Sequence, residues 1–211
     1  MTNWAQTERD LLCDALLASG PDAPTLCGEW TARDLTAHLV LRERRPLAAA
    51  GIVIHNPVLS RHTDKVQRQL ARTEWADLVG TLRSGPPRWS PTAIGPIDEI
   101  ANTVEFFVHH EDLRRAAPSW EPRQLDPAFE NTLARALGRL KLLVRRSPVG
   151  VRFCTPDGTV RLERRGPDTV TVTGPASELV LYAYGRQRHS RVELSGAEAG
   201  TRALQDASLG I

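Results

Sequence analysis

Residues 104–112 read Val104-Glu105-Phe106-Phe107-Val108-His109-His110-Glu111-Asp112, and their periodicity indicates where this part of the chain lies in the fold. In an α-helix, which turns by about 100° per residue, Glu105 and His109 stand one turn apart and can reach one ion. Asp98 and Asp112 share that polar strip, and apolar side chains lie on both sides of it. Carboxylates and imidazoles are costly to bury unless they are paired or bind a metal. The stretch therefore predicts an inward-facing helix of a bundle, with a candidate metal site on its polar strip.

The adjacent histidine, His110, falls on a different face of the same helix. Its helical neighbours are Thr103 and Arg114, a set that predicts a solvent-exposed side chain. We therefore favour His109 over His110 as a ligand. A Glu-x-x-x-His pair also occurs as a surface contact or around a core histidine, so the pair alone leaves those alternatives open.

A third candidate ligand, His38, lies on an earlier predicted helix. Thr31, followed three residues later by Asp34, predicts a capped helix start, and His38 then lies among leucines. Together with Glu105 and His109 it makes a mixed nitrogen and oxygen donor set. Such a set suits catalytic zinc, with a fourth position left for water or substrate. The residues predict a site for zinc or another divalent metal.

The first half of the chain has the apolar spacing of amphipathic helices, interrupted by glycine and proline. Four helices are expected, at residues 7–19, 31–46, 61–83 and 95–117, with a loop at 51–60.

The hydrophobic period changes from 3.6 to 2 after a fifth expected helix, residues 126–146. Strands are expected at 149–155, 160–165, 169–173 and 191–194, and helices at 175–185 and near the C-terminus. Residues 156–159, Pro-Asp-Gly-Thr, predict a hairpin turn. The pattern predicts an α+β protein, in which a four-helix bundle (residues 1–125) precedes a small α+β domain (residues 126–211).

Composition excludes several classes of function. A formal net charge of +2 over 211 residues is too small to indicate a nucleic-acid or anionic-membrane partner. No apolar run approaches a membrane span and the N-terminus lacks a signal-peptide pattern, so we expect a cytoplasmic protein. Cys13, Cys27 and Cys154 form no CxxC pair and predict buried, inert thiols, although Cys27 lies in the loop just before the helix of His38.

Two segments carry a resemblance to a known family. Trp30-Thr31-Ala32-Arg33-Asp34-Leu35-Thr36-Ala37-His38-Leu39 resembles the segment that holds the first metal ligand in mycothiol-dependent maleylpyruvate isomerase-like proteins of the DinB-like superfamily. Residues 105–112 resemble that family's second motif, a glutamate, three residues, a histidine and an aspartate three further on. Motif position implies that His38, Glu105 and His109 bind the metal. The resemblance extends more loosely to residues 174–186, which are similar to the family's C-terminal domain.

The resemblance implies an activity as well as a fold. A metal-bound small thiol, mycothiol, would add as a thiolate to a small electrophilic substrate, as in isomerases and S-transferases of this type. Arg186 and Arg188 are the candidates for a catalytic arginine that the isomerases carry in the C-terminal domain. Two alternatives stay open: a non-catalytic metal-binding or sensor protein on the same fold, and a chain whose three candidate ligands bind no metal.

Overall fold

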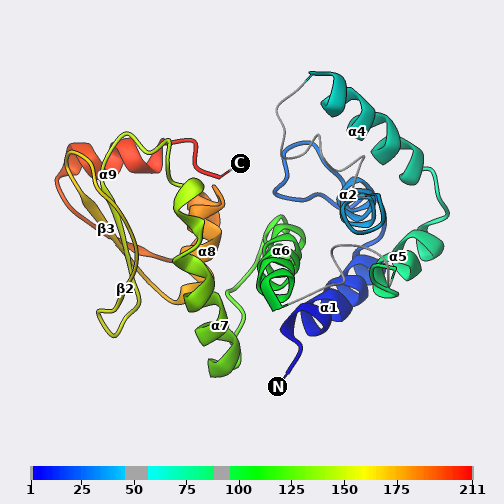
Figure 1. Cartoon of the computed structure of the whole chain (residues 1–211), viewed down its shortest axis with the longest axis horizontal. Helices are drawn as coiled ribbons and strands as arrows, with labels where there is room; N and C mark the ends of the chain where they lie inside the picture. Colours follow the sequence, from blue (N-terminus) through cyan, green and yellow to red (C-terminus); the bar gives the residue numbers. More distant parts are fainter. Residues whose placement is uncertain (1, 46–56, 88–95, 211) are drawn as a thin grey trace. The chain divides into compact units, whose positions relative to one another are not determined.

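The chain forms two compact units, residues 1–120 and 121–211, in a computed structural model that describes residues 2–45, 57–87 and 96–210 (Figure 1). The described part of the first unit is helical, and the second unit combines helices with a sheet. This confirms the predicted α+β class. The assignment of separate domains with a boundary at residues 125 and 126 stays a prediction.

The described part of the first unit consists of helices joined by loops and turns. The helices are α1 (Trp4–Ser19), α2 (Ala32–Arg44), α4 (Pro57–Leu70), α5 (Trp75–Arg83) and α6 (Pro96–Arg115). Before α2, the side chain of Thr31 accepts from the Asp34 backbone N–H, and the Asp34 carboxylate accepts from the Thr31 backbone N–H. This reciprocal pair satisfies two backbone donors, so the helix begins where the sequence predicted.

The single helix predicted over residues 61–83 is wrong, because α4 and α5 are separate helices. The chain turns at residues 71–74, and the side chain of Glu74 then accepts from the Asp77 backbone N–H and begins α5. Arg33 on α2 donates to the carbonyl oxygens of Ala71 and Thr73 at 3.0 and 2.8 Å, which satisfies acceptors at the break. Of the loop predicted at 51–60, residues 51–56 lie outside the described residues. Residues 57–60 are helical and belong to α4.

Apolar faces of α1, α2, α5 and α6 meet in the core of the first unit. Its fully buried members include Leu12, Leu16, Leu35, Leu39, Leu82 and Phe106. Charged residues also enter this interior, but in pairs. Arg9 bonds to Glu43, and Arg115 donates to Glu111 at 2.5 Å. Pairing lets these side chains be buried, because each charge has a partner inside the protein.

The second unit contains a mixed sheet covered by helices. Its elements are α7 (Pro127–Leu137), η2 (Leu140–Leu142), β1 (Val151–Cys154), β2 (Val160–Arg164), β3 (Val170–Thr173), α8 (Ala176–Ala183), η3 (Gln187–His189), β4 (Glu193–Ser195) and α9 (Glu198–Gln205). The described strands have the order β2-β1-β3-β4, with β1 parallel to β3 and the other neighbours antiparallel. Phe153 of β1 contacts Tyr182 of α8 edge-on, which packs the helix on the sheet.

Two local predictions for the second unit have opposite outcomes. The hairpin turn is confirmed, since Asp157 accepts hydrogen bonds from Thr155 and Thr159, and Gly158 takes a positive φ of 80°. The fifth helix is shorter than predicted and ends at Leu137 instead of near residue 146. Gly138 follows Leu137, and glycine disfavours helix by about 1 kcal/mol relative to alanine.

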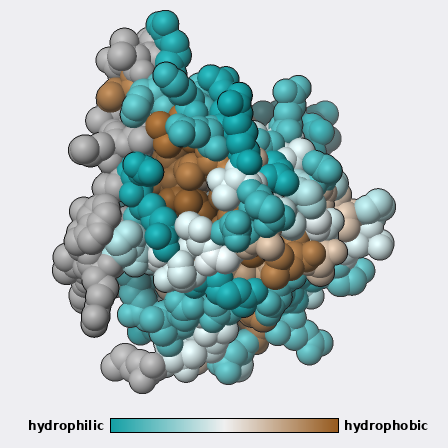
Figure 2. All heavy atoms as spheres, turned by 90° about the vertical axis from the view of Figure 1, so that its right-hand side faces the viewer, coloured by the Kyte–Doolittle hydropathy of each residue, from teal (hydrophilic) through white to brown (hydrophobic). Residues whose placement is uncertain are grey.

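The face of the molecule in Figure 2 is mostly hydrophilic, with apolar residues gathered in small areas. Among the described residues, no helix is both long enough and apolar enough to cross a bilayer.

Candidate metal centre

The three predicted ligands come together between α2 and α6 of the first unit. Nε2 of His109 lies 3.3 Å from Oε1 of Glu105, and Nε2 of His38 lies 3.7 Å from the same oxygen. All three donor atoms lie within 4.8 Å of one another. His109 and Glu105 are one turn apart on α6, so the helix itself sets their spacing, whereas His38 reaches them from α2.

These separations fit a shared cation better than direct hydrogen bonds. Hydrogen bonds between nitrogen and oxygen usually span about 2.7–3.2 Å, and both contacts are longer. Donors about 2.05 Å from a tetrahedral zinc ion stand about 3.3 Å apart, which is close to the two distances here. Two imidazole nitrogens and one carboxylate oxygen are also the donor types that zinc accepts.

The electrostatics of the three side chains are strongly coupled. Burial lowers the pKa of His38, which favours the neutral imidazole that a metal requires. Burial alone would raise the pKa of Glu105, but Arg42 and the two histidines outweigh it and hold that pKa well below the usual range. Burial likewise opposes charge on His109, yet its polar contacts with Asp112, Cys27 and Glu105 hold its pKa well above the usual range. Without metal, the site therefore carries a protonated His109 beside an ionised Glu105.

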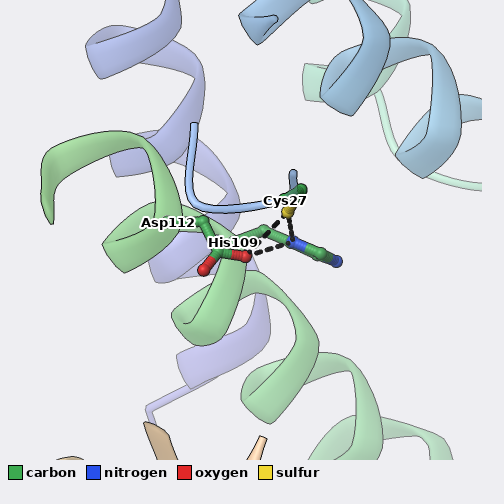
Figure 3. A group of neighbouring side chains, drawn as sticks. All are labelled: Cys27, His109 and Asp112. Atoms are coloured by element: carbon green, nitrogen blue, oxygen red, sulfur yellow. Dashed lines mark hydrogen bonds and ion pairs between the residues drawn. The ribbon is translucent and has the colours of Figure 1, made fainter. Parts of the chain in front are cut away.

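The second nitrogen of His109 is held by a buried carboxylate (Figure 3). Nδ1 of His109 lies 3.0 Å from Oδ2 of Asp112, whose side chain is fully buried. An ionised carboxylate can only accept, so Nδ1 carries a proton, and it is Nε2, facing Glu105, that can give up its proton and present a lone pair to a metal. Such a carboxylate contact fixes the tautomer and orientation of a metal-binding histidine.

Cys27 adds a thiol to the same contact. Its Sγ donates to Oδ2 of Asp112 at 3.1 Å and lies 3.7 Å from Nδ1 of His109 (Figure 3). The backbone N–H of Leu26 donates to the carbonyl oxygen of Asp112 at 3.1 Å, so backbone and side chain tie this loop to α6. At the other end of the loop, the Trp30 ring lies 5.0 Å from the His38 ring. One loop therefore contacts both histidines of the candidate centre.

Comparison with known proteins identifies solved structures that share the fold of this chain. No family model and no curated protein matches the chain. Two solved structures match it. A crystal structure of mycothiol-dependent maleylpyruvate isomerase has a TM-score of 0.55 and a sequence identity of 17%. A histidine-to-alanine mutant of that enzyme has a TM-score of 0.59 and a sequence identity of 16%. Each match covers 90% of this chain and 88% of the other. The chain has the mycothiol-dependent maleylpyruvate isomerase fold. The predicted α+β fold class agrees with these structures, and at this identity the likeness extends to the fold alone, so membership of the DinB-like superfamily stays a prediction.

Within the maleylpyruvate isomerase fold, His110 does not lie where we predicted. It is buried with 5% of its surface exposed, and its Nδ1 lies 3.3 Å from Oε2 of Glu8 on α1. The helical projection missed this because α1, about one hundred residues earlier in sequence, packs on that face of α6. Among the described residues two groups of side chains could hold a metal ion, His38 with Glu105 and His109, and Cys27 with His109 and Asp112, and His110 belongs to neither.

The remaining predicted residues divide between the two units of the fold. Cys13 is fully buried as predicted, and burial raises the pKa of its thiol to about 12. Arg42, one turn after His38, had no predicted role, although its Nε lies 3.5 Å from Oε1 of Glu105. Arg186 and Arg188 lie in the second unit, where Arg186 donates to the carbonyl oxygen of Tyr184 at 2.5 Å. Their catalytic role stays a prediction.

Proposed function

We propose that the chain is a metal-dependent enzyme that adds a small thiol to a small electrophile, as an isomerase or S-transferase of the mycothiol-dependent type. The observation that carries the proposal is the convergence of His38, Glu105 and His109 at separations suited to one cation. The fold, shared with a mycothiol-dependent isomerase, supports the choice of a thiol as cofactor.

The chain's own residues prepare the site for a cation. His38, Glu105 and His109 would hold zinc or another divalent metal through Nε2, Oε1 and Nε2. Asp112 keeps the proton of His109 on Nδ1, so only the Nε2 proton has to leave when a metal binds. When bound, the metal supplies an electrophilic centre that lowers the pKa of a coordinated thiol from its usual value of roughly 8.5.

An open coordination position distinguishes an enzyme from a structural or sensor site. Structural zinc sites usually have four protein ligands, whereas catalytic sites have three and leave the fourth position for water or substrate. Among residues 2–45, 57–87 and 96–210, no fourth histidine, cysteine or carboxylate joins the group of His38, Glu105 and His109. This favours the enzyme over the alternative of a non-catalytic metal-binding or sensor protein.

The proposal also includes the reaction partners and their location. The thiol, mycothiol or a similar cytoplasmic compound, adds through sulfur to the electrophile. Arg186 or Arg188 would hold a carboxylate of that electrophile through charge-assisted hydrogen bonds. Neither nucleic acid nor a membrane enters the proposed reaction, in keeping with a net charge of +2.

Metal analysis and a thiol assay test the proposal together. We expect about one divalent metal per chain in the purified wild type and in His62→Ala, a control that removes an exposed histidine. His38→Ala and His109→Ala should lose most of it. Zinc-loaded wild type should consume mycothiol with at least one member of a panel of small electrophiles, including maleylpyruvate. Full metal content in both ligand variants would refute the site, and an inert panel would refute the reaction.

A further inference from the structure

Arg42 is the charged side chain beside the candidate centre to which the proposed function gives no role. It follows His38 by one turn on α2, and its Nε lies 3.5 Å from Oε1 of Glu105. Its Nη1 donates to Oδ1 of Asn102 on α6 at 2.9 Å. The guanidinium is thus anchored against the helix that supplies two of the candidate ligands.

Among the described residues, Arg42 makes only a loose contact with a carboxylate. A charge-assisted hydrogen bond between arginine and a carboxylate spans about 2.7–2.9 Å, so the 3.5 Å contact with Glu105 is a loose one. The same Oε1 atom is shared with His38 and His109. Among the described residues, Glu105 is the one carboxylate that pairs with Arg42, and the other contact, Asn102, is a neutral amide.

Binding of a cation by Glu105 would weaken this one ion pair further. The carboxylate would then share its charge with the metal, and the other contact of Arg42 within the described part of the chain is the neutral amide of Asn102. With 22% of its side chain exposed, Arg42 is neither fully hydrated nor closed off from small molecules. A partly desolvated cation in this position favours an anionic partner.

We propose that Arg42 forms a carboxylate-binding position beside the metal, so that the site selects thiols or electrophiles that carry a carboxylate. The inference rests on the proposed function, because it takes a metal at His38, Glu105 and His109 as given. It names the class of ligand that the same centre prefers. The carboxylate can belong to the thiol or to the second substrate, and in both cases it pairs with the N–H donors of Arg42 that neither Asn102 nor Glu105 uses.

A binding experiment with cobalt(II) as the metal tests this without turnover. The thiolate-to-cobalt absorption band reports the affinity for two thiols of equal length, 3-mercaptopropionate and 3-mercaptopropanol. A second arm adds propionate to protein saturated with 3-mercaptopropanol, which detects a carboxylate on a separate molecule. The variants are Arg42→Gln, Arg42→Lys and the control Arg45→Gln, which removes the same charge from an exposed position at the end of α2.

The expected result is a preference for the carboxylate in at least one arm, lowered on the order of tenfold in Arg42→Gln. Arg42→Lys should retain part of the preference, and Arg45→Gln all of it. Equal preferences in wild type and Arg42→Gln would overturn the inference while leaving the metal centre intact. Failure of wild type to bind cobalt would instead overturn the proposed function, and the inference with it.

Discussion

Nδ1 of His109 lies 3.0 Å from Oδ2 of Asp112, at the ring nitrogen opposite the one that faces Glu105. Because this contact fixes the tautomer of His109, Asp112→Ala should weaken metal binding by about 10- to 100-fold. Asp112→Asn, which keeps an acceptor but loses the charge, should have a smaller effect. Competition with a chromophoric chelator measures both affinities. Asp64→Asn, an exposed change elsewhere in the first unit, serves as the control, and equal affinities in all four proteins would contradict the role of Asp112.

Cys27 contacts the same carboxylate, and its contribution can be separated from that of Asp112. Cys27→Ser retains a donor for Oδ2 of Asp112, whereas Cys27→Ala removes it. We expect the serine variant to bind metal like the wild type. The alanine variant should bind a few-fold more weakly, because Asp112 then keeps fewer of its hydrogen bonds. Loss of metal in both variants would mean that the thiol itself is a ligand.

The sequence predicted those parts of the site that a single helix determines. Glu105 and His109 are spaced by four residues on α6, so the helical period was enough to pair them. The buried contact of His110 with Glu8 and the thiol contact of Cys27 with Asp112 join residues separated by 102 and 85 positions. Such contacts depend on how α1 and the loop before α2 pack on α6, and local periodicity carries no information about that packing.

Glu111 and Arg115 are two charged residues on an otherwise apolar face of α6. They form a buried ion pair one turn apart, and both side chains are 1% exposed. Removing Arg115 takes one charged donor from Glu111, which keeps Arg114 as a donor at 2.9 Å, so Arg115→Met should destabilise the protein by about 1.5–3 kcal/mol. The double variant Glu111→Leu with Arg115→Met should regain much of that loss. Urea unfolding at neutral pH compares the wild type with Arg115→Met, Glu111→Leu and the double variant, and a loss in the double variant equal to the sum of the two single losses would argue against pairing.

Cys13 makes stability depend on pH in the alkaline range. Burial raises the pKa of its thiol from 9.0 to about 12. Below pH 9 the thiol is protonated in both the folded and the unfolded chain, and its contribution to stability is fully present. Between pH 9 and 12 the unfolded chain releases a proton that the folded chain keeps, so stability falls as pH rises. Urea unfolding at pH 8 and pH 10.5 should show a larger decrease for wild type than for Cys13→Ala. Equal decreases would show that Cys13 does not titrate as inferred.

Metal binding should raise the thermal stability of the protein only when all three ligands are present. A ligand that binds the folded state alone stabilises it by about 2.7 kcal/mol at a free concentration one hundred times its dissociation constant. We therefore expect zinc to raise the melting temperature of wild type and His62→Ala, and a chelator to reverse the rise. His109→Ala loses one of three ligands and the partner of Asp112, so zinc should leave its melting temperature nearly unchanged. If zinc stabilised His109→Ala as strongly as wild type, the ion would have to bind elsewhere in the chain, and the convergence of α2 and α6 on Glu105 would need another explanation.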